Sequence, residues 1–165
     1  GKLNKNIAIF MPTSAQMPDV DLVAINLTSK RIATIQVKGS RAYEPRKIEL
    51  ERYKHGSAGW FWLDARKITR CKADYFLFLI HVIRQNTKTG RRDIEPHMVL
   101  IKTDELIKRC KRHKKIKGNT WNFFIWINPV LKKAFDFHPT ADCNQLVFDD
   151  CLDQNGMNKL IKALK

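Results

Sequence analysis

The stretch from Met17 to Gly39, "MPDVDLVAINLTSKRIATIQVKG", decides the fold of this chain. It holds two runs of β-branched and other apolar residues, Val20 to Leu27 and Ile32 to Lys38, with the polar residues Thr28 to Arg31 between them. Two such runs joined by a short polar connection are typical of a β-hairpin. The sequence therefore predicts two antiparallel strands that lie side by side.

Polar side chains interrupt this predicted hairpin at three positions. Gln36 and Lys38 are two residues apart on one strand, so they point to the same face, roughly 6–7 Å apart. Asp21 lies on the preceding strand, from which its carboxylate can reach the same patch. An acid, an amide oxygen and a lysine suit Mg²⁺ or Mn²⁺ beside a phosphate, because these ions take oxygen ligands and the amine offsets transition-state charge.

The same residues resemble a known family. "PDVDLVAIN" followed by "IQVKG" resembles the core of the PD-(D/E)XK nuclease superfamily, which has the restriction-endonuclease-like fold. "ADYFLFLI", Ala73 to Ile80, resembles a later core strand of its resolvase-like members. The resemblance implies an α/β domain over residues 1–165, with a mixed central sheet flanked by helices. It also implies an endonuclease that needs Mg²⁺ or Mn²⁺ and hydrolyses phosphodiester bonds in DNA, with RNA as the alternative.

The resemblance also implies a role for each polar residue of the hairpin. Asp21 corresponds to the metal-binding aspartate, Gln36 to the second metal ligand and Lys38 to the catalytic lysine, with Asp19 as the alternative to Asp21. Gln36 departs from the family pattern, in which Glu or Asp is commoner, and a neutral ligand weakens a cation site. An inactive nucleic-acid-binding module of the same fold is therefore an alternative function. A nuclease toxin or a fragment of a restriction system is another.

The charge of the chain favours a polyanionic partner. Its 165 residues include 31 Lys and Arg against 16 Asp and Glu, which gives a net charge of +15. Such a charge binds nucleic acid through phosphate neutralisation and counterion release. No long apolar run or basic amphipathic helix stands out, so we expect no membrane partner, while a homodimer or a partner protein is left open. The four cysteines lack C-x-x-C spacing, and we interpret them as free thiols of a cytoplasmic protein.

Two basic segments are candidates for holding the nucleic-acid backbone. "SRAYEPRK", Ser40 to Lys47, directly follows Lys38, and "KRCKRHKKIKG", Lys108 to Gly118, has seven Lys or Arg in ten positions. For the second segment, a solvated helix end whose cations complement the helix dipole is the alternative. The candidate nucleic-acid-binding residues are Arg41, Arg46, Lys47, Lys111, Arg112, Lys114 and Lys115.

The remaining sequence predicts a mixture of strands and helices. We expect strands at Ile7–Met11, Trp60–Leu63, Tyr75–Arg84, Met98–Lys102 and Trp121–Ile127, helices at Thr103–Lys117 and Met157–Leu164, and either a helix or a loop at Glu44–Gly59. The four tryptophans alternate with apolar partners at strand spacing, so we expect all of them in the core: Trp60, Trp62, Trp121 and Trp126.

The beginning of the chain is short for the family that it resembles. Resolvase-like members open with a helix that carries a glutamate toward the metal, whereas only a few polar residues precede Ile7 here. We therefore expect that the native N-terminal helix is missing from this sequence. The alternatives are that Met157 to Leu164 covers the exposed sheet face, or that a partner chain does.

Overall fold

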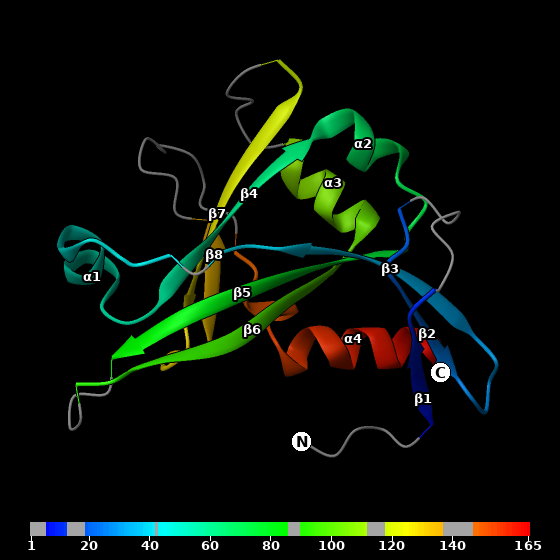
Figure 1. Cartoon of the computed structure of the whole chain (residues 1–165). Coiled ribbons are helices and arrows are strands. Elements are labelled where there is room, and N and C mark those ends of the chain that lie inside the picture. The colour runs from blue at the N-terminus through cyan, green and yellow to red at the C-terminus, as the bar shows by residue number, and fades with distance from the viewer. Residues whose placement is uncertain (1–5, 13–18, 42, 86–89, 112–117, 137–146) are drawn as a thin grey trace.

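The computed structural model describes residues 6–12, 19–41, 43–85, 90–111, 118–136 and 147–165, in a mixed α/β fold with two sheets and four α-helices (Figure 1). The larger sheet has the order β1 (Ile7–Phe10), β2 (Leu22–Asn26), β3 (Ile32–Gly39), β5 (Tyr75–Gln85) and β6 (Arg92–Lys102). β3 and β5 are parallel, and the other neighbours are antiparallel.

The predicted hairpin is confirmed. β2 and β3 pair in antiparallel register, with Leu22 opposite Ile35 and Ala24 opposite Ala33. Asn26 closes the turn, because its Oδ1 accepts hydrogen bonds from the Thr28 and Ser29 backbone N–H groups at 2.9 and 3.1 Å. A short Asx-type turn of this kind sets the register locally.

The smaller sheet covers one face of the larger one. It consists of β4 (Ser57–Asp64), β7 (Thr120–Asn128) and β8 (Lys133–Asp136), all antiparallel. Between β3 and β5 the chain forms α1 (Lys47–Tyr53), then β4, then α2 (Ala65–Arg70), so the undecided segment holds α1 and the start of β4. The shared core joins Phe61, Leu63, Phe123 and Ile125 of the smaller sheet to Phe76, Phe78 and Ile80 of β5.

Gly59 sets how closely the two sheets approach. A Cβ atom at this position would lie 2.8 Å from Cγ1 of Ile80 on β5. Any larger residue would therefore push β4 away from the larger sheet. This contact holds the edge strand β4 close to β5, the neighbour of β3 in the larger sheet.

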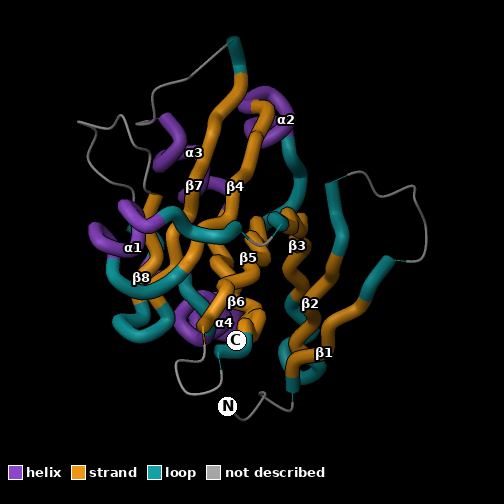
Figure 2. The backbone as a smooth tube through the Cα atoms, turned by 60° about the vertical axis from the view of Figure 1, so that its left-hand side comes forward, coloured by secondary structure: helices purple, strands orange, loops and turns teal. Residues whose placement is uncertain are grey.

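Helix α4 (Gln154–Leu164) covers the opposite face of the larger sheet, as Figure 2 shows from a second side. Leu160 and Leu164 pack against Ala24, Ala33, Ile35, Tyr75 and Leu100. The Asn26 side-chain amide also donates to the backbone oxygen of Leu164 at 3.0 Å. The sequence left three ways to cover the exposed sheet face: a missing N-terminal helix, the helix at Met157 to Leu164, or a partner chain. Among the described residues, the helix at Met157 to Leu164, which is part of α4, covers this face.

Some predicted boundaries are wrong. β6 begins at Arg92 rather than at Met98, and it contains Pro96. Proline is tolerated there because β6 is an edge strand, where no neighbour needs its missing N–H. Helix α3 (Thr103–Lys111) begins as predicted, and residues 112–117 lie outside the described ranges. No described helix is both long and apolar enough to cross a membrane.

Candidate functional site

Asp21 and Gln36 meet at the open end of the β2–β3 hairpin. The Gln36 side-chain nitrogen donates a hydrogen bond to Oδ2 of Asp21. The Val37 backbone N–H donates to the same oxygen at 2.6 Å, and the Asp21 N–H donates to the Ile35 carbonyl at 2.9 Å. The carboxylate is therefore held against β3 through one oxygen, while no described residue donates to its other oxygen.

Lys38 follows on the same face of β3 and lines a pocket with Gln36. The pocket has a volume of about 260 Å³. Its other walls come from Asp19 before β2, from the end of β4, from α2 and the residue that follows it, and from β5: Trp62, Leu63, Asp64, Lys67, Ile68, Cys71 and Phe76. Gln36 is buried and Lys38 is partly buried. Within the described ranges the Lys38 ammonium has no hydrogen bond or ion pair, so it is available to an anionic ligand.

The two acids before β2 take different positions. Asp21 contacts Gln36, whereas Asp19 lines the pocket itself and has a positive φ of 69°. That backbone region is unfavourable for a residue with a Cβ, so the surrounding chain must hold Asp19 there. The Asp19 carbonyl also lies 3.9 Å from the Cys71 sulfur. Both acids are exposed, but only Asp19 lines the pocket, whereas Asp21 is held against β3 through its contact with the pocket residue Gln36.

Cys71 is a wall of this pocket rather than a nucleophile. Burial raises the pKa of its thiol, and the carboxylates of Asp19 and Asp21 raise it further, while the backbone of Ala73 and the charge of Lys38 act in the opposite direction. A thiol with a raised pKa stays protonated at neutral pH, and the thiol is a poor nucleophile.

Asp64 is a pocket residue that the sequence analysis missed. It ends β4 and caps α2, because its Oδ1 accepts hydrogen bonds from the backbone N–H groups of Arg66 at 2.8 Å and Lys67 at 3.3 Å. The hydrogen bond from Arg66 is the main reason that the Asp64 pKa lies below its usual range. The signal was present: an Asp directly after an apolar strand run and before "ARK" is a helix N-cap pattern.

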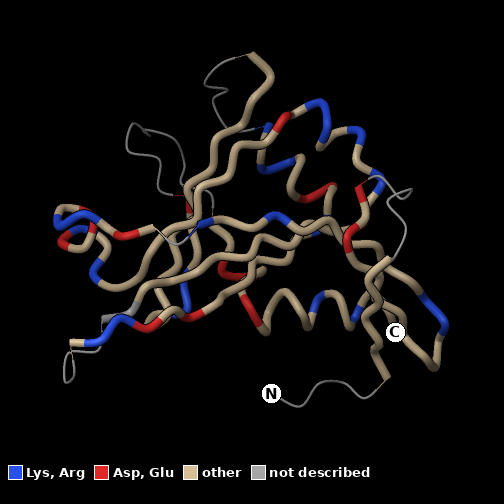
Figure 3. The backbone as a smooth tube through the Cα atoms, viewed as in Figure 1, with Lys and Arg blue, Asp and Glu red and all other residues tan. Residues whose placement is uncertain are grey.

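Besides Lys38, the cations at and beside the pocket come from α2. Arg66, Lys67 and Arg70 are exposed, and they line a second hollow with Asp19 and Asp64. Figure 3 shows these blue positions along α2. No sequence motif marked α2 as basic, because its cations are spread among apolar residues.

The predicted basic residues lie elsewhere. Arg41 is exposed just after β3, whereas Arg46 and Lys47 are at α1, where they form ion pairs with Glu49 and Glu51 at 2.7 and 4.0 Å. Lys111 is the exposed last residue of α3. None of these four lines the pocket. Arg112, Lys114 and Lys115 lie outside the described residues.

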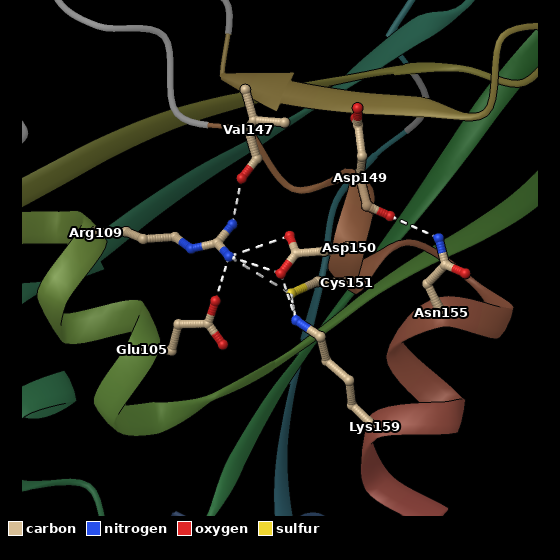
Figure 4. A network of polar contacts seen from close by, with 8 residues as sticks. All are labelled: Glu105, Arg109, Val147, Asp149, Asp150, Cys151, Asn155 and Lys159. Carbon is tan, nitrogen blue, oxygen red and sulfur yellow. Dashed lines mark hydrogen bonds and ion pairs between the residues drawn. The ribbon is translucent and has the colours of Figure 1, made fainter.

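A second group of ligand-like side chains occurs far from the hairpin site. The group consists of Glu105, Asp150 and Cys151, whose ligand atoms all lie within 4.8 Å of one another. Among the described residues, no other group of three His, Cys, Asp or Glu side chains has this spacing. Figure 4 shows that Arg109 lies among them: it binds Glu105, both oxygens of Asp150 at 3.1 Å and the Val147 carbonyl. Lys159 also binds Asp150.

These contacts around Arg109, which we call the Arg109 network, stabilise the packing of neighbouring elements and do not form a metal site. Its acids already face two cations, and burial raises the pKa of Cys151 to about 11, so the thiol is protonated at neutral pH. A cation at this group would have to displace Arg109 and Lys159 from the two acids. The network instead joins α3 to the short helix η1 (Asp149–Cys151) and to α4.

Comparison of the chain with models of protein families, with curated proteins and with solved structures finds no match.

Proposed function

We propose that this chain is a nuclease that uses Mg²⁺ or Mn²⁺ to hydrolyse phosphodiester bonds, with DNA as its substrate. The observation that carries the proposal is the contact between Asp21 and Gln36, with Lys38 next on the same strand face and free of a described partner. These are the three residues that the resemblance to the PD-(D/E)XK superfamily selects. The parallel strand β5, which holds most of "ADYFLFLI", lies beside β3 and adds support for that fold.

The donor set suits a hard divalent cation. Asp21 has an oxygen that no described residue occupies, and Gln36 offers an amide oxygen beside it. A half-turn about the last side-chain torsion of Gln36 exchanges its nitrogen and oxygen, and a nearby cation favours that turn because it attracts the oxygen. Asp21 and Gln36 would hold the ion. Bound there, Mg²⁺ or Mn²⁺ supplies a Lewis acid and a water of lowered pKa.

The side chains around the ion site have distinct tasks. The Lys38 ammonium is placed to offset the negative charge that grows on the phosphate in the transition state, or to orient the attacking water. The exposed cations of α2 lie next to the same pocket and hold flanking phosphates. Asp19 and Asp64 add two carboxylates at the rim.

The experiment is plasmid cleavage with Mg²⁺, with Mn²⁺ and with EDTA. We expect cleavage with either metal and none with EDTA. Lys38→Ala should cut about 100- to 1,000-fold more slowly, because the charge that it supplies acts in the transition state, while DNA affinity changes little. Lys162→Ala is the matched control, since it removes an exposed lysine from α4 on the other face of the sheet. Equal cleavage by the two variants would contradict the proposal.

A second candidate is a binding module of the same fold that does not cleave. The observation that favours it is the hydrogen bond from the Gln36 nitrogen to Asp21, because an amide satisfies this carboxylate without any metal. Tight DNA binding that EDTA leaves unchanged, together with no cleavage in Mn²⁺, would select this candidate over the nuclease.

A further inference from the structure

Three aromatic side chains form an exposed strip beside the pocket. Trp60 and Trp62 on β4 are 52% and 69% exposed, and the partly buried Phe124 lies opposite Trp60 on β7. The prediction that all four tryptophans lie in the core is therefore wrong for these two, while Trp121 and Trp126 are buried. Trp62 also lines the pocket with Gln36 and Lys38. We call Trp60, Trp62 and Phe124 the aromatic strip.

The rings of the strip are held in place before any ligand arrives. Trp60 stacks on Phe124 with an interplanar angle of 8° and a centroid distance of 5.5 Å, and Trp62 meets Trp60 edge-on at 5.5 Å. The Trp60 indole N–H donates to the Asn122 side-chain oxygen. Ligand binding therefore costs little conformational entropy of these side chains, because the rings are already ordered.

The strip is also tied to the strand that carries Lys38. The Trp60 backbone N–H donates to the Ser40 hydroxyl at 2.9 Å, and Ser40 follows Lys38 by two residues. Trp60 therefore lies at the end of β3, and Trp62 lies where the pocket holds Lys38. The strip follows the path that a chain leaving the pocket would take along β4.

Folding does not explain the exposure of this strip. The other end of the same outer face carries Ala58 and Trp126, which are buried against Tyr43, Tyr53 and Phe135. The core face of β4 is filled by Phe61 and Leu63. Two neighbouring exposed tryptophans on a stable sheet are a mark of a binding surface.

The charge around the strip identifies its occupant. Lys38 and Lys67 share the pocket with Trp62, and Arg66 and Arg70 lie on the same helix as Lys67. A ligand that meets both features has flat π-faces and closely spaced negative charges, which describes a nucleic-acid strand. In a duplex the base faces are hidden by stacking and pairing, so only unpaired bases can lie on an indole ring.

We propose that the aromatic strip stacks unpaired bases, and that the substrate class of the neighbouring pocket is nucleic acid with a single-stranded segment. The choice of substrate rests on the proposed nuclease function. The stacking itself does not, because it needs neither metal nor cleavage.

The test is tryptophan fluorescence titration in EDTA with three ligands: a single-stranded dT oligomer, a DNA duplex of equal length and a U oligomer. For wild type we expect quenching and tighter binding of the single strands than of the duplex. Trp62→Ala should weaken single-strand binding about ten-fold, as expected for loss of one stacked base, and change duplex binding less than about two-fold. The two single strands report separately on DNA and RNA.

Two further variants separate stacking from folding and from general apolar contact. Trp62→Phe keeps an aromatic face and should bind single strands within about three-fold of wild type. Ile94→Ala removes another exposed apolar side chain, 62% exposed on β6, and should change nothing. Circular dichroism checks that each variant is folded. Trp60→Ala tests the other exposed tryptophan of the strip and should also weaken single-strand binding.

Three results would overturn the inference: equal losses for duplex and single strand, no loss in either tryptophan variant, or a wild-type dimer that Trp62→Ala converts to a monomer. The last result would make the strip an interface between two copies. If the protein never cleaves DNA but Trp62→Ala loses single-strand binding, the proposed nuclease function fails and the stacking stands. If the protein cleaves DNA but both tryptophan variants bind single strands in EDTA as tightly as wild type, the stacking fails alone.

Discussion

The hairpin site and the Arg109 network hold similar groups but treat their charges in opposite ways. In the network, Asp150 faces Arg109 and Lys159, and Glu105 faces Arg109, so each acid meets a cation. At the hairpin, Asp21 meets a neutral amide and a backbone N–H, and Lys38 has no described partner. Groups that neutralise one another hold a fold together, whereas groups left uncompensated are available to a ligand.

Replacing one aspartate in each region by asparagine should give the largest difference between the two regions in cleavage and in stability. Asp21→Asn should lower the proposed metal-dependent cleavage at least ~100-fold, because it removes the charge of the proposed metal ligand, and it should leave the melting temperature nearly unchanged. Asp150→Asn should leave cleavage unchanged and lower the melting temperature by about 3 °C, as expected for about 1 kcal/mol from a partly exposed ion pair. Cleavage assays and thermal melts on both variants measure this. If Asp150→Asn lowered cleavage and Asp21→Asn lowered the melting temperature, the Arg109 network would be the functional site and the hairpin site the structural one.

The cations of α2 should matter more for DNA affinity than those of α1. Arg66, Lys67 and Arg70 lie beside the pocket, and of these Arg66 pairs with Asp64 at 3.9 Å. Arg46 and Lys47 do not line the pocket, and both are paired with acids. Changing the three α2 cations to Gln should reduce the slope of log K against log salt by about 2–3, since each phosphate contact contributes about 0.9. Changing Arg46 and Lys47 to Gln is the control and should alter the slope by less than about 1. Equal effects would mean that the sequence-based assignment of α1 was the better one.

Gln36→Glu should make the hairpin site depend on metal for its stability. The new carboxylate would face Asp21 at hydrogen-bonding distance, and two like charges repel unless a cation lies between them. We expect the melting temperature without metal to fall by a few degrees, roughly 1 kcal/mol, and Mg²⁺ or Mn²⁺ to restore it. Wild type should respond less to the metal. A melting temperature that metal does not change would show that Gln36 is not at an ion site.

The smallest effect concerns acid stability of the Arg109 network. Burial alone would raise the pKa of Asp150, but hydrogen bonds from Lys159 and Arg109 outweigh burial, and its pKa lies below the ordinary value of 3.8. A lowered folded pKa adds stability above 3.8 that is lost as the pH falls through the folded value. The stability difference between wild type and Asp150→Asn should therefore be constant near neutral pH and shrink below about pH 4. Denaturant titrations at several pH values measure it.

Local patterns predicted the hairpin and its three polar residues because that information is short-range. Period-two alternation and a four-residue connection place Gln36 and Lys38 on one face, and the Asn26 turn holds Asp21 opposite Gln36. The strands β5 and β7 and the helix α4 were predicted for the same reason, since each is a continuous run of one periodicity. Asp64 was missed because it reaches the pocket only through the packing of β4, a strand of the other sheet, beside Gln36 and Lys38.

By itself, the sequence determined the hairpin, the polar residues on it and the large positive charge. Only the tertiary structure decided which face of β4 is buried. Along "WFWLD" the two faces offer Trp60 and Trp62 or Phe61 and Leu63, and both sets are apolar enough to fill a core. The choice follows from Gly59, which lets β4 lie against Ile80, and from β7, which sets the pairing register. The tryptophans are exposed beside Lys38 because packing between distant segments, rather than local alternation, turned the other face inward.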